Sequence, residues 1–332
     1  MITNLFALVV CFLITILFGP IVINAIKKLK AKQTILHYVE QHKEKQGTPT
    51  MGGIMFILPC ILTSFLLFKQ DYTLAIICLA VMVCFAVLGF LDDFIKIKYK
   101  QNLGLRAYQK IIGQVGISIV LSIFAYRTNL VGSKLYLPFC NGQAIDLGVW
   151  IVPFNMFVLL ALVNSVNLID GLDGLCSGVS FVNFVTFGII ITLSSNFVSG
   201  GLVKEYQNIS IVAYSITGAL LAYFVYNCFP AKVFMGDTGS LALGGLLSSI
   251  AILTGTTLYI PIIGFMYVLT AVSDVLQVAY YKTTKKRIFK MAPIHHHFQM
   301  QGMNENRITV IYIITTMLIS LSSVALILFV GG

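Results

Sequence analysis

Long runs of apolar residues alternate along the chain with short polar segments. A membrane-crossing α-helix needs roughly 20 apolar residues, and most of these runs approach that length. Hydropathy predicts ten approximate spans, at residues 2–26, 53–68, 73–91, 108–126, 151–169, 176–195, 208–226, 239–257, 259–281 and 307–330. The run at 53–68 is short, and the boundary near 255–261 can be drawn in two ways. We expect an all-α, polytopic membrane protein in which residues 1–332 form one transmembrane domain.

Composition supports this fold class. The 332 residues are 58% hydrophobic and only 10% charged, whereas soluble proteins carry roughly 25% charged residues. The seven cysteines have no CxxC spacing, so they are expected to be small apolar side chains rather than disulfides or zinc ligands. The first apolar run is longer than the core of a signal peptide and lacks a basic leader, which favours a first span.

The distribution of basic residues predicts the orientation, because cytoplasmic loops collect Lys and Arg. Of the 22 basic residues, the segments after even-numbered spans hold only four, namely Lys69, Arg127, Lys134 and Lys204. The other 18 follow odd-numbered spans or border them. We therefore expect the odd loops to face the cytoplasm and both termini to lie outside.

The outer segment from Arg127 to Trp150 contains Asn141-Gly142 between two apolar stretches. Asn-Gly is the preferred turn of a two-residue β-hairpin. A small periplasmic hairpin is predicted, most simply as a structural cap.

Carboxylates gather in the loops predicted to be cytoplasmic. Nine of the twelve lie on or near that side: Glu40, Glu44, Asp92, Asp93, Asp170, Asp173, Asp237, Asp274 and Glu305. A carboxylate near hydrocarbon is costly and marks a functional site by default. The clustering therefore predicts chemistry at one surface of the membrane.

The third span runs directly into Asp92-Asp93, with Lys96 one turn later. Adjacent residues on a helix point about 100 degrees apart, which suits the two carboxylates to different tasks, such as a base and a metal or hydrogen-bond partner. A solvated helix end paired with Lys96 is the simpler alternative.

The fifth span ends in NSVNLIDGLDG at 164–174, with polar residues repeated every three positions. On a helix leading into a glycine-rich turn, this spacing predicts a polar stripe of amides and carboxylates, which can hold hydrated magnesium or a nucleotide. A polar seam between helices is the structural alternative.

Two further segments combine glycine with phosphate-binding or metal-binding groups. After the seventh span, FMGDTGS at 234–240 offers backbone N–H donors and the hard oxygen ligand Asp237 at a helix start, although Asp237 or Thr238 could simply cap that helix. In the first cytoplasmic loop, KQGTPTMGG at 45–53 combines a cation with hydroxyls and flexible backbone; an ordinary loop is the simpler interpretation.

The last odd loop carries a basic run at 282–290 and then His295-His296-His297. In an extended segment neighbouring side chains alternate, so three histidines would not face one zinc ion. Hydrogen bonds to phosphate are favoured for them, and the basic run could contact anionic lipid.

These segments together resemble the phospho-N-acetylmuramoyl-pentapeptide transferases, a branch of the polyprenyl-phosphate N-acetylhexosamine-1-phosphate transferase superfamily. The resemblance is carried by GTPTMGG at 47–53, LGFLDDFIK at 88–96, NSVNLIDGLDGL at 164–175, FMGDTGSLALGG at 234–245 and APIHHHF at 292–298. It implies a ten-helix homodimer in the bacterial inner membrane. The implied reaction is Mg²⁺-dependent transfer of phospho-MurNAc-pentapeptide from its UDP carrier, UDP-MurNAc-pentapeptide, to undecaprenyl phosphate, yielding UMP and lipid I.

The resemblance also implies roles for individual residues. Asp237 corresponds to the magnesium ligand, and Asp92, with Asp93 beside it, to the residue that deprotonates or positions the lipid phosphate. Substrate-facing positions are Lys45, Asn167, Asp170, Gly171, Leu172, Asp173, Asn227 and Phe234, with Thr50, Lys96, Lys110 and Gln277 as weaker matches. His295 lies in the motif assigned to the sugar and peptide, as do His296 and His297, which are the two counted as catalytic. No nucleic-acid partner is expected.

Two departures from the family pattern concern peptide recognition only, namely Gln299 in place of Glu and Leu168-Ile169-Asp170 in place of Leu-Thr-Asp. Phosphoryl transfer needs charge neutralisation and in-line positioning, which one metal ion with lysines and histidines can supply. Two alternatives remain at this point. One is a transferase of the same superfamily that uses UDP-GlcNAc, and the other is an ion-coupled transporter, which should instead place its acidic groups near the membrane midplane.

Overall fold

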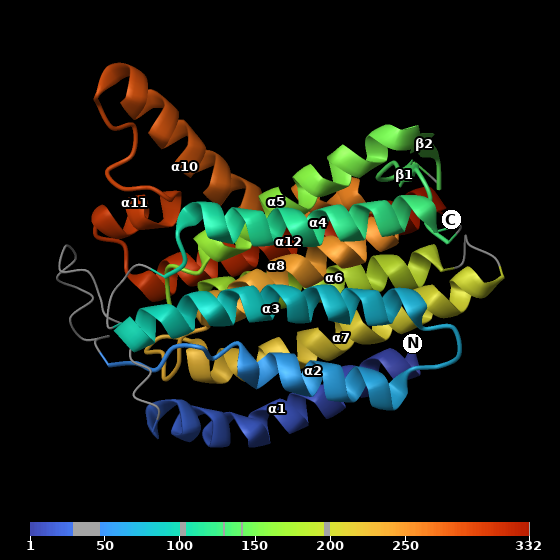
Figure 1. The fold of residues 1–332 in the computed structure, drawn as a ribbon, viewed down its shortest axis with the longest axis horizontal. Coiled ribbons are helices and arrows are strands. Elements are labelled where there is room, and N and C mark those ends of the chain that lie inside the picture. Colours follow the sequence, from blue (N-terminus) through green and yellow to red (C-terminus); the bar gives the residue numbers. More distant parts are fainter. Residues whose placement is uncertain (29–46, 100–103, 129, 141, 196–199, 332) are drawn as a thin grey trace.

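The computed structural model describes residues 1–28, 47–99, 104–128, 130–140, 142–195 and 200–331. Its helices run roughly parallel to one long axis, and both termini lie at the same end (Figure 1). The helices are α1 (Ile2–Lys28), α2 (Ile54–Leu67), α3 (Thr73–Tyr99), α4 (Ala107–Arg127), α5 (Ile151–Ile169), α6 (Leu175–Ser194), α7 (Gly201–Asn227), α8 (Gly236–Leu253), α9 (Ile260–Ile263), α10 (Phe265–Thr284), α11 (Ile294–Met300) and α12 (Glu305–Gly331), with short 3-10 turns η2 (Gly148–Trp150) and η3 (Thr257–Tyr259).

The apolar runs fold as predicted into helices of membrane-crossing length. Within the described residues, eight helices are long and apolar enough to cross a bilayer. The predicted span at 53–68 becomes α2, which at 14 residues is shorter than the others. Together these findings make the chain an all-α, multi-pass membrane protein.

The predicted span at 259–281 is not one straight helix. It is broken at Gly264, where η3 and α9 meet α10 at 79°. Hydropathy reports apolar length but carries no information about a bend, so this break was missed. As a result α10 leaves the bundle at an angle (Figure 1).

Helix α8 lies at the centre of the bundle and is buried along nearly its whole length. It packs against α3 on one side and α5 on another. Its glycines and serines have small side chains, so the backbones of neighbouring helices can approach it closely. Gly89 of α3 shows how close: a Cβ built there would lie 2.0 Å from the backbone oxygen of Asp237. The ends of α3, α5 and α8 are therefore held together.

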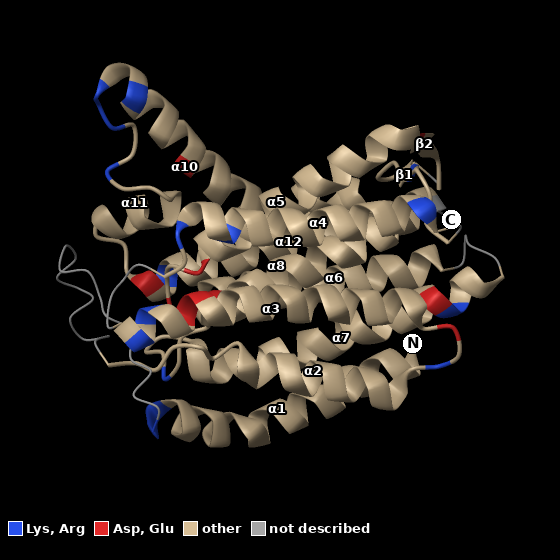
Figure 2. Cartoon of the chain, viewed as in Figure 1, with Lys and Arg blue, Asp and Glu red and all other residues tan. Residues whose placement is uncertain are grey.

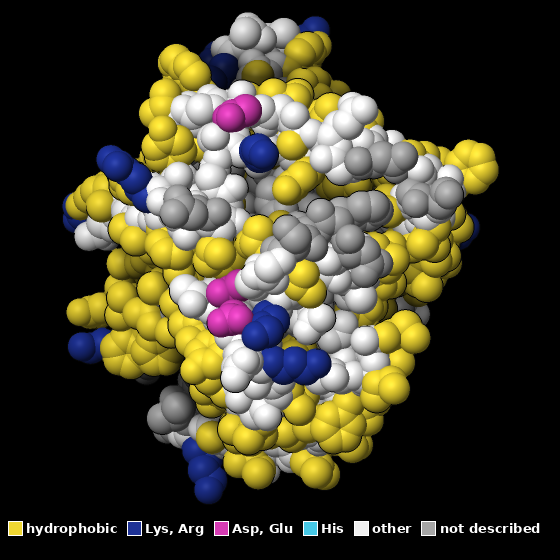
Figure 3. Space-filling model, turned by 90° about the vertical axis from the view of Figure 1, so that its right-hand side faces the viewer, with side chains coloured by type: hydrophobic (Ala, Val, Ile, Leu, Met, Phe, Trp, Pro, Cys, Tyr) yellow, Lys and Arg dark blue, Asp and Glu magenta, His cyan; other side chains and the backbone are white. Residues whose placement is uncertain are grey.

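The predicted hairpin is present. Strands β1 (Lys134–Tyr136) and β2 (Ala144–Asp146) pair antiparallel, with Lys134 opposite Asp146; Asn141 of the turn lies outside the described residues. The hairpin is at the end that carries both termini (Figure 1). Seen from that end, charged side chains occur in small separate groups (Figure 3). All seven cysteines are free, as predicted.

Candidate active site

Three carboxylates meet where α3 and α8 come together. Asp92 and Asp93 from the last turns of α3 and Asp237 from the first turn of α8 each offer an oxygen within 4.8 Å of the others. Asp92 and Asp93 are each only 3% exposed, which excludes the solvated helix end considered from sequence. The cluster lies at the end of the bundle opposite the termini, among most of the lysines (Figure 2), and not at mid-length as the transporter alternative requires.

The two neighbouring aspartates have different partners, as their helical spacing predicts. Asp93 accepts hydrogen bonds from the Thr238 hydroxyl at 2.7 Å and from the backbone N–H groups of Thr238 and Asp237 at 2.9 and 3.2 Å. It thereby anchors the start of α8. Asp92 accepts from the Leu105 N–H at 2.9 Å, and its other oxygen lies 2.5 Å from the Lys96 ammonium.

Two lysines balance part of this negative charge. Lys96 Nζ lies 3.0 Å and Lys110 Nζ 2.9 Å from Asp237 Oδ2. The other oxygen, Oδ1, accepts a hydrogen bond from the Asn167 amide at 2.7 Å, and the same amide also reaches Ser240 at 2.8 Å. Three residues that the resemblance assigns to the substrate, Lys96, Lys110 and Asn167, therefore lie beside Asp237. Three carboxylates against two ammonium groups leave a net negative charge that favours a cation.

The glycine-rich turn after α5 borders the cluster. Asp170 is largely buried there, and burial, reinforced by the negative charges of Asp237, Asp93 and Asp173, raises its pKa to about 8. Its carboxyl group therefore holds a proton more readily than an ordinary aspartate does. Leu172 and Asp173 of the same turn are buried.

The two glycine-containing segments at 47–53 and 234–240 are joined to each other by backbone hydrogen bonds. Phe234 donates to the Pro49 carbonyl, and Gly52 donates to the Phe234 carbonyl, both at 2.8 Å. Thr50 faces the cluster, because a Cβ at Gly236 would contact both the Thr50 hydroxyl and Asp93 Oδ2. The segments at 47–53 and 234–240 thus form one surface. Lys45 lies outside the described residues.

The histidines lie on a short helix, α11, and not on the extended segment assumed from sequence. Consecutive side chains on a helix diverge by about 100 degrees, yet the His295 and His296 rings are in contact, with centroids 4.4 Å apart. His295 is fully buried, and burial together with His296 lowers its pKa well below 6.5. His297 accepts a hydrogen bond from the Lys290 N–H at 3.1 Å, which fixes the preceding loop.

His295 and His296 pack against the turn after α5. A Cβ built on Gly171 would lie 2.6 Å from His295 Nε2 and 3.0 Å from His296 Nε2. Only glycine fits there without a shift. The structure therefore brings the His motif and the Asp170–Gly174 turn together, although they are more than 120 residues apart in sequence.

Two other predicted residues, Gln277 and Asn227, form hydrogen bonds with neighbouring loops. The Gln277 amide bonds the backbone of Ile288 and Phe289 at 2.9–3.1 Å, holding the basic loop against α10. Asn227 accepts from Ser177 at 2.7 Å and donates to the Val233 carbonyl at 3.0 Å. Asn227 therefore shapes the loop that carries Phe234.

Sequence reasoning assigned no role to Glu305. This side chain, from the first turn of α12, accepts a 2.5 Å hydrogen bond from the backbone N–H of Asp173. The Thr309 hydroxyl donates to the Asp173 carbonyl at 3.0 Å. The only signal in the sequence is an acidic residue shortly after the His motif, which by itself does not indicate its partner.

The cluster can bind a divalent metal ion by its chemistry. Carboxylate oxygens are the hard ligands that Mg²⁺ prefers, and three of them converge from two rigid helices. The lysines, the Gly171 turn and the histidines surround the same region, which suits a ligand carrying several phosphate charges.

Comparison with known proteins agrees with this chemistry. A model of glycosyl transferase family 4 matches residues 75–255, and signature 1 of the phospho-N-acetylmuramoyl-pentapeptide-transferases matches residues 45–57. The phospho-N-acetylmuramoyl-pentapeptide-transferase of Alkaliphilus metalliredigens is 42% identical over 330 residues, covering 96% of both chains. Those of Clostridioides difficile and Clostridium novyi are 42% and 36% identical, covering 94–96% of each chain. The chain therefore belongs to the phospho-N-acetylmuramoyl-pentapeptide-transferase family.

Proposed function

We propose that this protein transfers phospho-MurNAc-pentapeptide from UDP-MurNAc-pentapeptide to undecaprenyl phosphate in peptidoglycan synthesis. Overall, a bond forms between an oxygen of the lipid phosphate and the phosphorus attached to the sugar. The bond from that phosphorus to the UMP oxygen breaks, so UMP and lipid I are the products. The observation that carries the proposal is the set of three carboxylates and two lysines, in a chain whose relatives bear this enzyme's name.

Asp237, Asp92 and Asp93 are the residues that would hold Mg²⁺, with Asp237 as the principal ligand. Bound there, the ion would neutralise phosphate charge during transfer. Asp93 already holds the start of α8 through three hydrogen bonds, so its main contribution is to fix the position of Asp237. Asp92 has fewer protein donors and is the better candidate to position or deprotonate the lipid phosphate.

Lys96 and Lys110 supply mobile positive charge beside the same carboxylates. Each ammonium lies within 3.0 Å of Asp237 Oδ2, so a small movement of either side chain lets it pair with a substrate phosphate. The proton on Asp170 and the imidazoles on α11 provide hydrogen-bond donors on the opposite side of the Gly171 turn. We assign the nucleotide to that turn, with Phe234 and Leu172, and the sugar and peptide to His295, His296 and His297.

The orientation follows from the substrates and the charges. We propose that the end with the carboxylate cluster faces the cytoplasm, where a soluble UDP-sugar is available and where the basic residues concentrate. Both termini and the hairpin are then outside. We further propose that the chain works as one transmembrane domain and pairs as a homodimer, which light scattering of the detergent-solubilised protein would test.

The direct test is UMP release from UDP-MurNAc-pentapeptide in detergent with undecaprenyl phosphate and Mg²⁺. Asp237→Asn should abolish it, as should chelation of the metal from the wild type. Asp71→Asn is the matched control, since Asp71 is an exposed aspartate between α2 and α3 whose ion pair among the described residues is with Lys204. Near-normal turnover in Asp237→Asn would overturn the metal assignment. Transfer from UDP-GlcNAc in place of the muramoyl substrate would instead favour the related superfamily activity.

A further inference from the structure

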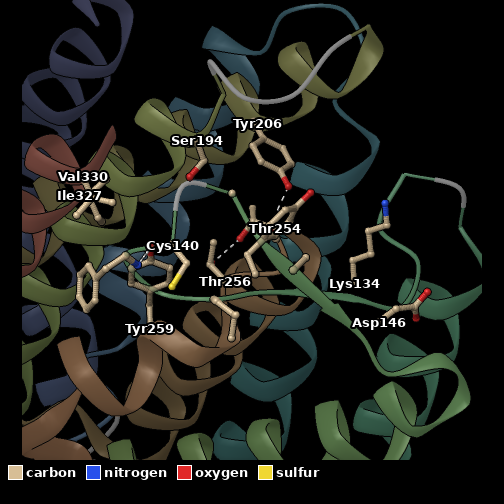
Figure 4. A pocket seen from close by; sticks show the side chains of 15 residues that line it. Lys134, Cys140, Asp146, Ser194, Tyr206, Thr254, Thr256, Tyr259, Ile327 and Val330 are labelled. Atoms are coloured by element: carbon tan, nitrogen blue, oxygen red, sulfur yellow. Dashed lines mark hydrogen bonds between the residues drawn. The ribbon is translucent and has the colours of Figure 1, made fainter. Parts of the chain in front are cut away.

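A cavity of about 470 Å³ lies beneath the hairpin, at the end of the bundle opposite the carboxylate cluster. Its walls come from the hairpin, from η3 and the end of α8, and from the last turns of α12 (Figure 4). The volume falls within the range of about 300–1,000 Å³ that is typical of small-molecule sites. The proposed transfer reaction assigns it no role.

The hairpin is fastened over this cavity by specific contacts. The Tyr136 N–H donates to the Gly255 carbonyl at 3.0 Å, and the Phe139 N–H donates to the Tyr259 hydroxyl at 3.3 Å. The Phe139 and Tyr259 rings meet edge to face with centroids 5.7 Å apart. The hairpin that covers the cavity is therefore held in place by specific contacts with the rest of the fold.

Most polar groups of the wall are satisfied by the protein itself. The Tyr206 hydroxyl donates to the Thr254 carbonyl at 3.0 Å, and the Thr254 and Thr256 hydroxyls bond one another at 2.8 Å. The wall as a whole presents both polar and apolar surface, with the apolar surface somewhat larger. Such a lining favours a ligand with a substantial apolar part.

Lys134 supplies a cation at the rim. Its cross-strand neighbour, Asp146, would be the obvious partner, but one Asp146 oxygen accepts the Ser133 hydroxyl at 2.5 Å and the Gly148 N–H at 2.9 Å. Among the described residues Asp146 is near enough to interact electrostatically with Lys134, but the lysine side chain is exposed and open to a further partner. A ligand with an anionic group can therefore pair with it.

The last turns of α12 connect the cavity to the membrane. Ile327 and Val330 line it, whereas Leu326, Leu328 and Phe329 on the same turns are 46%, 56% and 85% exposed. One side of this helix end thus faces the cavity and the other faces lipid. A hydrocarbon chain can pass along the helix into the site without leaving an apolar environment.

We propose that this cavity binds an amphiphile, with a phosphate head group at Lys134 and a hydrocarbon chain against Phe139, Ile327 and Val330. Two sources share this chemistry: a phospholipid of the bilayer and a polyprenyl phosphate. A purely soluble anion lacks the apolar part that the walls require. A neutral lipid lacks the charge that Lys134 can pair.

Cys140 can report on ligand binding in the cavity, because it is a free, partly buried thiol in the cavity wall. The detergent-solubilised full chain would be treated with a maleimide, and labelling at Cys140 would be followed by peptide mass spectrometry. Cys228, a partly buried thiol just after α7 at the other end of the bundle, serves as the internal reference. Phosphatidylglycerol, decaprenyl phosphate and diacylglycerol would each be added over a concentration series.

At least one of the two phosphate lipids should slow the labelling of Cys140 and leave the labelling of Cys228 unchanged. The concentration that gives half-protection should be at least about five-fold lower than for diacylglycerol. Lys134→Gln should raise the half-protecting concentration by about 1.4- to five-fold, the range for one exposed ion pair. Lys204→Gln, at a lysine of the same end that pairs with Asp71 outside the cavity, should leave it unchanged.

Protection by phosphatidylglycerol alone would identify a bilayer phospholipid, and protection by decaprenyl phosphate alone would identify a carrier lipid; both outcomes support the proposal. Equal protection by diacylglycerol, or unchanged protection in Lys134→Gln, would overturn it. So would a Cys140 thiol that does not react in lipid-free protein, because the cavity would then be closed. Native mass spectrometry of bound lipid provides a second readout, and neither measurement depends on UMP release.

Discussion

Asp173 and Glu305 are 132 residues apart, yet the Asp173 backbone N–H donates a 2.5 Å hydrogen bond to Glu305. Asp173 is also held through its carbonyl by Thr309 and through its own carboxylate by the Ala231 N–H at 3.0 Å. The turn assigned to the nucleotide is therefore fixed by α12 and by the loop that carries Phe234. This arrangement makes the start of α12 part of the site's support.

Removing that support should weaken nucleotide binding more than catalysis. A hydrogen bond to a charged group contributes about 1.5–3 kcal/mol, so Glu305→Ala should raise KM for the UDP-sugar roughly ten-fold or more, with a smaller fall in kcat. Glu305→Gln keeps an acceptor oxygen and should recover part of the loss. Steady-state kinetics checks this. Asn306→Ala, at the exposed next position, is the control, and an unchanged KM in Glu305→Ala would refute the support role.

Gly171→Ala should lower both activity and stability. The new methyl group would lie within 2.6–3.0 Å of His295 and His296, so the histidines or the turn must move, at a cost of about 1–3 kcal/mol. Gly116→Ala is the matched control, because a Cβ there meets nothing within 4 Å and α4 continues through it. That variant should be neutral or slightly stabilising. Melting temperatures and UMP release, measured for both variants, would separate the two effects, and equal behaviour would argue against the contact.

Asp93→Asn and Glu205→Gln form a second matched pair. Both carboxylates are 3% exposed and accept hydrogen bonds at the start of a helix. Asp93 does so for α8, and Glu205 for α3 at the opposite end, through the N–H groups of Thr73 and Leu74. Each variant should lose about 1–3 kcal/mol of stability. Only Asp93→Asn should also lose nearly all UMP release, and comparable activity in the two would show that Asp93 is merely structural.

The buried imidazole of His295 predicts a dependence of stability on pH. Its pKa is lowered by burial in the folded state, whereas the unfolded chain protonates near pH 6.5. Below that pH the unfolded state binds the extra proton, so the stabilising contribution is lost as pH falls, by about 1.4 kcal/mol per pH unit. Thermal unfolding without metal should show this loss as the difference between wild type and His295→Gln. Parallel curves would contradict it.

Asp170 makes the stability of the fold depend on pH in the opposite direction. Its pKa of about 8 in the fold exceeds its ordinary value near 4, so the folded state holds a proton that the unfolded state has released. Stability therefore falls as pH rises from about 4 to 8. Asp170→Asn should flatten that fall, most visibly between pH 6.5 and 8, where His295 no longer contributes. Added Mg²⁺ should reduce the difference between wild type and variant, because a cation favours the ionised carboxylate.

Sequence predicted the helices and the gathering of carboxylates at one end of the bundle, for a physical reason. Apolar length is a local property, and polar residues at the ends of packed spans must share one membrane surface. The break at Gly264, the helical form of the His295 segment and the partner of Glu305 depend on tertiary contacts. The loop-holding hydrogen bonds of Gln277 and Asn227 likewise depend on tertiary contacts that the sequence does not show.

The contact of Gly89 with the Asp237 backbone has a consequence for how the site tolerates change. Because no side chain lies between the two main chains there, the spacing of Asp237 from Asp92 and Asp93 is set by backbone against backbone. Repacking side chains elsewhere in the bundle can alter stability while leaving this spacing unchanged. The geometry of the carboxylate cluster is thus insulated from substitutions elsewhere in the bundle.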